Sequence, residues 1–311
     1  MFWVVVVLVL TYHLVCWALS RLRVGDYSKK HVLITGCDTG FGNLLAKRLD
    51  GLGFKVFAAC LTSAGAEKLQ AACSERVTTL QLDVADEDSI AAAREFVGNR
   101  LPEGTGLWGV VNNAGILGPP VPCEWLKRED YVKNLAVNLF GMIDVTRAFL
   151  PFVRRAKGRV VNASSTYGRI APGPAPYCIS KYGVEAFSDC LRREVYRQGV
   201  KVCILEPGFF KTGLAPADAV ISSFQRWYDA TPPEIRQHYL PPDKLAKLAE
   251  KIRAGSYDNL NLVVDAYELA LTSRFPPTRQ LVGWDVRIVY RLLWNLPTPL
   301  TDWILNAMSG E

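Results

Sequence analysis

The stretch Thr35-Gly36-Cys37-Asp38-Thr39-Gly40-Phe41-Gly42 determines the fold that this sequence predicts. It ends a short apolar run, His31–Thr35, and it opens a segment in which leucines recur with the spacing of a helix. Between a strand and a helix, glycines let the backbone approach a pyrophosphate, and the helix N-terminus supplies a positive dipole. The stretch predicts a dinucleotide-binding turn, although a plain tight turn would also explain three glycines.

The strand and helix pattern recurs along the chain. Further apolar runs occupy residues 55–60, 77–82, 107–111, 159–162 and 200–205, and helical periodicity fills the stretches between them. Strands that alternate with helices form a parallel sheet with both faces covered. We expect an α/β fold of the Rossmann type, a doubly wound parallel sheet, as a single domain over residues 31–283. Residues 209–257 break the rhythm with prolines and aromatic residues, and they predict a substrate lid.

Composition excludes several classes of protein. The chain has 311 residues, 50% of them hydrophobic and 21% charged, so an apolar core can stabilise it without disulfides. The net charge of +6 comes from scattered Lys and Arg residues, which argues against nucleic acid as the main partner. Eight cysteines form no Cys-x-x-Cys pair and only three histidines are present, which predicts reduced thiols and no metal site.

The N-terminus carries a membrane signal. Residues 1–20 include no charged side chain, and their length is about that of a helix crossing a hydrocarbon core of roughly 30 Å. A cleaved signal peptide is the alternative, but no basic residue precedes the apolar stretch. Basic residues follow it in a linker over 21–30, which favours a cytosolic catalytic domain and leaves a lumenal one open. Residues 284–311 form an amphipathic segment that lies on the membrane surface or closes the domain core.

A catalytic pair is predicted from the spacing of two side chains. Tyr177 and Lys181 stand four residues apart at the start of a helical segment, so they share one face. A phenol with a pKa of about 10 is a poor base at neutral pH unless a nearby cation stabilises its phenolate. Asn112-Asn113-Ala114-Gly115 and Ser164-Ser165 follow the fourth and fifth predicted strands. All of these residues are expected at the carboxyl edge of one sheet, where such folds bind ligands.

The form of the dinucleotide depends on charges near the second strand. That strand ends Ala58-Ala59-Cys60-Leu61-Thr62, with neither an acid for a ribose diol nor an Arg for a 2′-phosphate. Asp38 in the glycine turn places a negative charge near such a phosphate, which favours NAD over NADP. Asp83, after the third strand, is placed to accept a hydrogen bond from an adenine amino group, or else to cap the following helix.

These residues and their order resemble the short-chain dehydrogenase/reductase family over residues 31–212. The resemblance implies a role for each matching residue. Ser165 would hydrogen-bond the substrate oxygen, with Ser164 as the alternative serine. Tyr177 would take or give the proton of that oxygen, and Lys181 would lower the tyrosine pKa and bind the nicotinamide ribose. Asn138 would hold the water that links the lysine to solvent.

The resemblance also implies which residues contact the cofactor. Pro207 and Gly208 would form the turn beside the nicotinamide, and Thr212 would contact its carboxamide. The full set expected to bind the cofactor is Thr35, Gly36, Cys37, Asp38, Gly40, Phe41, Gly42, Asp83, Asn113, Ala114, Gly115, Tyr177, Lys181, Pro207, Gly208 and Thr212.

Within the family, the sequence is similar to the membrane-bound retinol and hydroxysteroid dehydrogenases of microsomes. The matching stretches are 35–43, 107–116, 177–194 and 206–212, together with the apolar N-terminus and Gly283-Trp284-Asp285. This resemblance implies an anchor in the endoplasmic reticulum membrane and a homodimer through the helices near Met142 and Tyr182. It implies NAD-dependent oxidation of a lipophilic alcohol, either retinol to retinal or a 3α- or 17β-hydroxysteroid to its ketosteroid.

The lid supplies the candidate substrate contacts. Phe209, Phe210, Phe224 and Trp227 are expected to contact a lipophilic substrate, or else to form core. Two other functions stay open: an NADPH-dependent carbonyl reductase, and a catalytically silent dinucleotide-binding membrane protein. The silent protein would have no need of an activated phenol.

Overall fold

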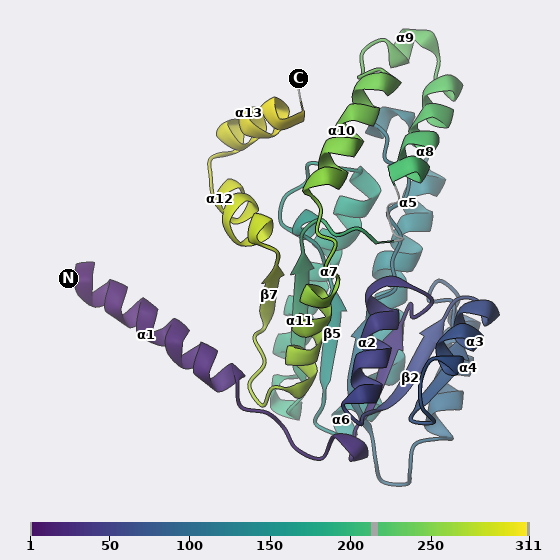
Figure 1. Ribbon diagram of the computed structural model, residues 1–311, viewed down its shortest axis with the longest axis vertical. Coiled ribbons are helices and arrows are strands. Elements are labelled where there is room, and N and C mark those ends of the chain that lie inside the picture. The colour runs from purple at the N-terminus through teal and green to yellow at the C-terminus, as the bar shows by residue number, and fades with distance from the viewer. Residues whose placement is uncertain (1, 213–216, 310–311) are drawn as a thin grey trace.

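The computed structural model describes residues 2–212 and 217–309, and its centre is a sheet of seven parallel strands (Figure 1). The strand order is β3-β2-β1-β4-β5-β6-β7. The strands are β1 (His31–Thr35), β2 (Lys55–Cys60), β3 (Val77–Gln81), β4 (Leu107–Asn112), β5 (Arg159–Ala163), β6 (Lys201–Pro207) and β7 (Arg279–Val282). The first six agree with the predicted runs to within two residues, so the predicted doubly wound α/β fold is confirmed.

The seventh strand is a feature that the sequence pattern does not predict. Arg279–Val282 has four residues, of which only Val282 is buried, so it lacks the apolar run that marks the other strands. It pairs in parallel with β6, placing Leu281 opposite Glu206. A residue far along the chain is thereby brought beside the strand that ends at Pro207.

Two layers of helices cover the sheet. On one face, α2 (Gly40–Gly51) and α11 (Asn261–Thr272) pack Leu45, Leu49 and Tyr267 against alternate strand residues such as Val32. On the other face lie α4 (Glu87–Gly98), α6 (Met142–Arg155) and α7 (Ala175–Glu194), packed against residues such as Leu33. Successive strand side chains point to opposite faces, so each strand contributes to both cores.

The remaining elements connect these layers or lie at their ends. The helices are α3 (Ser63–Ala71), α5 (Arg128–Leu135), α9 (Pro233–Arg236), α12 (Arg291–Leu293) and α13 (Thr298–Ser309). Short 3₁₀ turns are η1 (Tyr27–Lys29), η2 (Cys123–Trp125), η4 (Thr166–Gly168) and η5 (Tyr196–Gln198), and π-helical turns are η3 (Ala136–Gly141) and η6 (Asp285–Tyr290).

The described part of residues 209–257 forms helices beyond the carboxyl end of the sheet (Figure 1). They are α8 (Ala217–Ala230), α9 and α10 (Pro242–Gly255), and residues 213–216 of the predicted lid lie outside the described residues. A backbone bridge between Phe210 and Tyr257 and an ion pair between Lys211 and Asp258 (2.8 Å) close the base of the segment. The segment therefore leaves and rejoins the sheet at one point.

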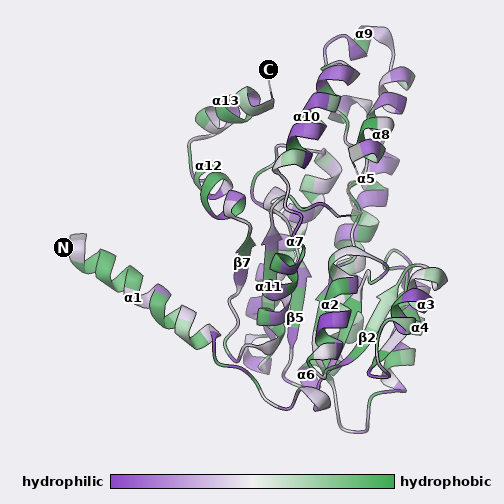
Figure 2. Ribbon diagram, viewed as in Figure 1, coloured by the Kyte–Doolittle hydropathy of each residue, from purple (hydrophilic) through white to green (hydrophobic). Residues whose placement is uncertain are grey.

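The N-terminal helix α1 (Phe2–Ser20) extends away from the sheet and is apolar over most of its length (Figure 2). Its window Trp3–Ser20 is long and apolar enough to cross a membrane and is 6% buried. The stretch Arg128–Arg155 passes the same test, but its 39% burial and its place in the second helical layer make it a core segment. Just after α1, residues 22–24 pair with 272–274: Val24 N donates to Thr272 O (2.8 Å) and Arg274 N to Leu22 O (2.7 Å).

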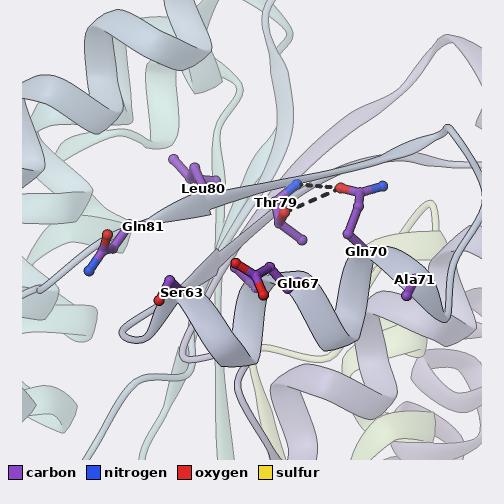
Figure 3. A pocket seen from close by; sticks show the side chains of 8 residues that line it. Ser63, Glu67, Gln70, Ala71, Thr79, Leu80 and Gln81 are labelled. Atoms are coloured by element: carbon purple, nitrogen blue, oxygen red, sulfur yellow. Dashed lines mark hydrogen bonds between the residues drawn. The ribbon is translucent and has the colours of Figure 1, made fainter.

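A surface cavity of about 540 Å³ lies at the outer edge of the sheet, between α3 and the edge strand β3 (Figure 3). Gln70 on α3 donates to Val77 O (2.8 Å) and accepts from Thr79 N (3.1 Å). Its side-chain amide therefore pairs with backbone groups of the edge strand that a neighbouring strand would otherwise pair with. The other lining residues are Ser63, Ala66, Glu67, Ala71, Leu80 and Gln81. None of these residues belongs to the predicted catalytic set, so this cavity is not the candidate active site.

Candidate active site

The glycine turn forms a close-packed cradle between β1 and α2. Gly36 has φ +69°, and a Cβ atom there would lie 2.8 Å from Ala114 Cα. A Cβ at Gly42 would lie 2.6 Å from Asn113 Nδ2, whereas one at Gly40 (φ +63°) would meet no atom within 4 Å. Side chains are therefore excluded on the inner side of the turn, and the outer side at Gly40 is open. Thr39, the N-cap of α2, makes no side-chain capping bond, which leaves the positive helix end available to an anion.

The segment 112–115 stabilises this turn by hydrogen bonds. Thr35 Oγ1 accepts from the N–H groups of Asn113 and Ala114, both at 3.1 Å. The Asn113 amide donates to Thr35 O and Gly36 O, both at 3.0 Å. Gly115 follows at the open end, where a Cβ would lie 3.3 Å from Asn138 Oδ1 and 3.9 Å from Lys181 Nζ. The structure thus brings the predicted cofactor residues of β1 and β4 to one edge.

Asp38 binds the turn after the second strand. Its carboxylate accepts from Leu61 N (2.8 Å), Thr62 N (3.0 Å) and Thr62 Oγ1 (2.7 Å). Burial raises the pKa of Asp38, but the bonds from Thr62 and Leu61 outweigh burial and hold that pKa below its usual value. The carboxylate is therefore ionised at neutral pH and faces the N-terminus of α3.

The other predicted cofactor residues near the turn differ in exposure. Cys37 is fully buried and its thiol donates to Ile34 O, so only its backbone faces the turn. Phe41 packs edge-on against Phe210, with ring centres 5.7 Å apart. Asp83 is exposed after β3 and accepts from Ala85 N (2.9 Å), while Asp86 caps α4. Of the two roles considered for Asp83, the cap of α4 belongs to Asp86.

The two adjacent serines point to different places. Ser165 is the N-cap of the turn η4, and its Oγ accepts from Tyr167 N (3.2 Å). Its hydroxyl also hydrogen-bonds the phenol of Tyr177. Ser164 Oγ is buried beside Gly168 and Glu185 and has no hydrogen-bond partner in the described part of the chain. Ser165 is therefore the serine that faces Tyr177.

Tyr177 and Lys181 lie at the start of α7 on its buried side, as their spacing predicts. Burial raises the pKa of Tyr177 to about 12, against the hydrogen bond from Ser165, which lowers it. Burial lowers the pKa of Lys181 to about 8, and the charge of Glu185 raises it. Lys181 Nζ donates to Ala163 O (2.8 Å) and lies 5.4 Å from the centre of the Tyr177 ring. Burial is thus the dominant influence on both groups.

Asn138 reaches the site from a π-helical turn. The turn η3 interrupts the helical run from α5 to α6 and directs Asn138 inward, where it is 2% exposed. Its Oδ1 accepts from Ile116 N and its Nδ2 donates to Ile116 O, both at 2.8 Å. Nδ2 also donates to Ser180 Oγ on α7 (3.1 Å). Asn138 therefore joins the segment after β4 to the helix that carries Tyr177.

The turn after β6 lies between η4 and the C-terminal segment. Pro207 O accepts from Thr166 Oγ1 (3.0 Å), and Gly208 N donates to Val282 O (2.9 Å). Thr212 N donates to Phe210 O (2.9 Å). A Cβ at Gly208 would collide with the carboxylate of Asp285, a residue that the sequence alone does not assign to the site. Only a glycine allows Asp285 to pack this closely.

The four predicted substrate aromatics do not form one wall. Phe209 packs against Tyr167 (5.6 Å between ring centres), and Tyr167 packs against Tyr177 (6.0 Å). Phe210 instead stacks on Tyr257. Phe224 is 3% exposed and, with Trp227, packs around Trp125 in a separate apolar cluster. Phe209 thus shares the ring neighbour Tyr167 with Tyr177. Tyr167 is an aromatic neighbour that sequence patterns miss, and its position two residues after Ser165 is the available signal.

No group of three or more His, Cys, Asp or Glu side chains that could hold a metal occurs among the described residues. The cysteines in the same residues are all free thiols.

The chain belongs to the short-chain dehydrogenase family, whose family model matches residues 30–219. Among curated proteins, it is 48% identical to human 17-beta-hydroxysteroid dehydrogenase type 6, with 95% of this chain and 93% of the relative covered. It is 45% identical to human retinol dehydrogenase 16 (96% and 94% covered) and 47% identical to mouse retinol dehydrogenase 7 (93% and 92% covered). The protein is therefore an oxidoreductase.

Solved structures agree with this assignment. A short-chain dehydrogenase from Streptomyces avermitilis has a TM-score of 0.68 and 26% identity, covering 91% of this chain and 98% of its own. A 3-ketoacyl-(acyl-carrier-protein) reductase from Brucella melitensis, complexed with NADH, has a TM-score of 0.56 and 28% identity, covering 71% and 89%. The cofactor of the family is a nicotinamide dinucleotide. The glycine turn fits it because Gly36 and Gly42 let the turn pack tightly against Asn113 and Ala114, while the outer side at Gly40 and the N-terminus of α2 stay open to a pyrophosphate.

Proposed function

We propose that the protein oxidises a lipophilic alcohol, transferring hydride to NAD. The observation that carries the proposal is the convergence of Ser165, Tyr177 and Lys181 beside the glycine cradle, with Ser165 rather than Ser164 bonded to the phenol. The relatives at 45–48% identity are named for alcohols of this kind, retinol and 17-beta-hydroxysteroids. Ser165, Tyr177, Lys181 and Asn138 are the residues proposed for the chemistry.

In the proposed mechanism, Ser165 donates a hydrogen bond to the substrate oxygen and orients the hydroxyl toward Tyr177. Tyr177, as phenolate, takes the hydroxyl proton, so that the carbinol C–H bond breaks as the carbonyl forms. Nicotinamide, when bound, accepts the hydride released from that carbon. The ammonium of Lys181 stabilises the phenolate, and Asn138 holds the polar path by which the proton leaves toward solvent. Because burial alone keeps the phenol protonated, the phenolate depends on positive charge close to it.

The proposed substrate is a retinoid or a hydroxysteroid. Tyr167 and Phe209 form aromatic surface next to Tyr177, and such surface suits a large apolar molecule. The carbon to be oxidised would lie between Tyr177 and the nicotinamide turn at Gly208. Phe210 is proposed to act through Phe41 and the glycine turn, and Phe224 and Trp227 through the packing of the lid.

The direct test is turnover by purified, detergent-solubilised protein. We expect reduction of NAD with all-trans-retinol or with a 3α- or 17β-hydroxysteroid, measured as NADH absorbance, and slower reaction with NADP. Turnover with NADP alone would reverse the cofactor assignment and favour a carbonyl reductase. Cofactor binding without turnover of any alcohol would contradict the proposed substrate class.

The preference for NAD is proposed from the position of Asp38. Its carboxylate already engages the three donors at the end of β2 and the start of α3, the place where the 2′-position of a bound ribose is read in this fold. A 2′-phosphate would meet an ionised carboxylate instead of those donors. Two like charges about 4 Å apart repel by roughly 4 kcal/mol at the effective dielectric of a protein surface.

Replacing Asp38 with serine is expected to raise kcat/KM with NADP relative to NAD by at least about tenfold, which corresponds to about 1.4 kcal/mol. The variant removes the charge and frees the donors of Leu61 and Thr62. The measurement is the ratio of kcat/KM values for the two cofactors. Asp86→Ser is the matched control, because it removes a helix-capping carboxylate from α4 and should leave the ratio unchanged. An unchanged ratio in Asp38→Ser would contradict the assignment.

We also propose that α1 anchors the protein in the endoplasmic reticulum membrane with a cytosolic catalytic domain. Its exposed apolar surface and the basic residues Arg21 and Arg23 support this orientation. Deleting residues 2–20 is expected to move the protein from the carbonate-resistant membrane fraction to the supernatant. Protease should digest the full-length domain in intact microsomes. Protection would indicate a lumenal domain, and a deletion variant that stays in the pellet would assign membrane binding elsewhere.

A further inference from the structure

A buried group of charges lies beneath α7, outside the proposed catalytic set. Arg279, the first residue of β7, contacts the carboxylates of Glu185 on α7 and Glu206 on β6, the latter at 2.9 Å. Its other terminal nitrogen lies 2.9 Å from Asp189 on α7. Glu206 is 1% exposed and Glu185 6% exposed, so two carboxylates are buried around one guanidinium.

The two carboxylates lie next to the two parts of the site that must be aligned. Glu185 follows Lys181 by one helical turn and faces the same side of α7. Glu206 immediately precedes Pro207 and Gly208, the turn proposed to lie beside the nicotinamide. The guanidinium of Arg279 therefore connects α7, which carries Tyr177 and Lys181, with β6, which ends at the turn proposed to lie beside the nicotinamide.

The charges in this group compensate one another. Burial raises the pKa of Glu206, the charge of Glu185 raises it further, and Arg279 lowers it. The two carboxylates in turn raise the pKa of Arg279 above its usual value, against the effect of its burial. Removing one partner from such a buried group leaves an uncompensated charge, which is far more costly than losing an exposed ion pair.

We propose that Arg279 is a positioning residue for the oxidation: it fixes α7 against β6 and neutralises Glu185, so that the Tyr177–Lys181 pair titrates in the range the reaction needs. The proposal rests on the roles given above to Tyr177 and Lys181. It assigns a function to β7, the strand that the sequence pattern does not predict.

The charged groups around Glu185 and Glu206 set the sign of the expected effect. Arg279 contacts Glu185, Glu206 and Asp189, and Glu185 acts on Lys181. Arg192 pairs with Asp189, and Arg169 after η4 acts on Glu206. Without Arg279, Glu185 and Glu206 make the potential at Lys181 and Tyr177 more negative. The coupled pair then loses its first proton at a higher pH. The acid limb of the kcat/KM profile should therefore move to higher pH.

The experiment compares pH profiles of kcat/KM for wild type, Arg279→Gln and the double variant Arg279→Gln/Glu185→Gln. We expect the acid limb of Arg279→Gln to shift up by at least about half a pH unit, and the double variant to shift back. Glu185→Gln alone should shift the limb down, since it removes a negative charge and keeps Arg279. Arg192→Gln is the matched control: among the described residues Arg192 pairs with Asp189 and not with Glu185 or Glu206, so its loss should leave the limb in place. Arg279→Lys should retain most of the wild-type profile.

A superimposable acid limb in Arg279→Gln, or a double variant whose limb does not return, would overturn the proposal. A purely structural Arg279 would lower stability and kcat without moving the limb in opposite directions in Arg279→Gln and Glu185→Gln. If Arg279→Gln does not fold, Glu185→Gln and Arg279→Lys still test the sign. Ultraviolet titration of the phenol, taken as the difference between each protein and its Tyr177→Phe counterpart, needs no substrate. It therefore distinguishes failure here from failure of the proposed substrate class.

Discussion

Tyr177→Phe is expected to lower kcat by about 10³-fold and to leave the dissociation constant of the dinucleotide within a factor of about 3. The change removes one hydroxyl from a buried ring that otherwise keeps its contacts with Tyr167. Without the phenolate the proposed acceptor of the hydroxyl proton is missing, whereas the glycine cradle proposed to bind the cofactor is unchanged. The measurements are steady-state rates and cofactor binding by fluorescence titration.

The two adjacent serines provide an internal control for that result. Ser165→Ala is expected to lower kcat by about 10²-fold, the typical cost of losing one preorganised donor. Ser164→Ala should stay within about threefold of wild type, because Ser164 faces Gly168 and Glu185 rather than Tyr177. Near-normal turnover in Tyr177→Phe would contradict the role proposed for Tyr177. A larger loss in Ser164→Ala than in Ser165→Ala would contradict the role proposed for Ser165.

Gly36→Ala is expected to weaken cofactor binding by at least about tenfold, or about 1.4 kcal/mol. Alanine costs roughly 1–2 kcal/mol in the left-handed conformation that Gly36 adopts at φ +69°. Its Cβ would also lie 2.8 Å from Ala114 Cα, so the backbone must shift and the cradle opens. Isothermal titration would measure the affinity, and the same strain should lower Tm by a few degrees, at roughly 2–4 °C per kcal/mol.

Gly51→Ala, at the far end of the helix that follows the glycine turn, is the matched control. Gly51 ends α2 with no atom within 4 Å of its Cβ position, and its φ is not positive. Alanine there should leave cofactor affinity unchanged and raise stability by roughly 0.5–1 kcal/mol. If both variants weakened cofactor binding equally, the packing of Gly36 against Ala114 could not be the cause.

Much of the fold was predictable because parallel strands buried on both faces carry continuous apolar runs. β1 and β2 have this character, and their ends are predicted to the residue. β7 was not predictable, since Arg279 and its two neighbours are half-buried and polar or mixed in character. Its place depends on pairing with β6, a contact between residues more than seventy positions apart.

The site was predictable where local spacing fixes geometry. Tyr177 and Lys181 share a face because four residues make about one helical turn. The choice between Ser164 and Ser165 depended on the turn η4, which directs Ser165 toward the phenol. Asn138 was placed by the family resemblance alone, because it lies on a π-helical turn that regular helical periodicity does not anticipate.

The lid aromatics mark where composition gives no answer. Aromatic residues near a site suit either a ligand or a core, and the sequence does not state which partner each ring meets. Phe224 meets Trp125, a residue about a hundred positions earlier, in a cluster that holds the lid helices together. Phe209 meets Tyr167 instead and lies toward Tyr177.

The short connection after α1 holds the catalytic domain close to that helix. Only Arg21 separates the end of α1 at Ser20 from the residues that pair with 272–274. With α1 in a bilayer, no flexible linker would let the domain move away from the membrane surface. The domain would then diffuse in two dimensions with the lipids. Its encounters with a dissolved alcohol then depend on the mole fraction of that alcohol in its own membrane. Diluting the membrane with inert lipid should slow turnover, even where the amount of alcohol per volume of water stays constant.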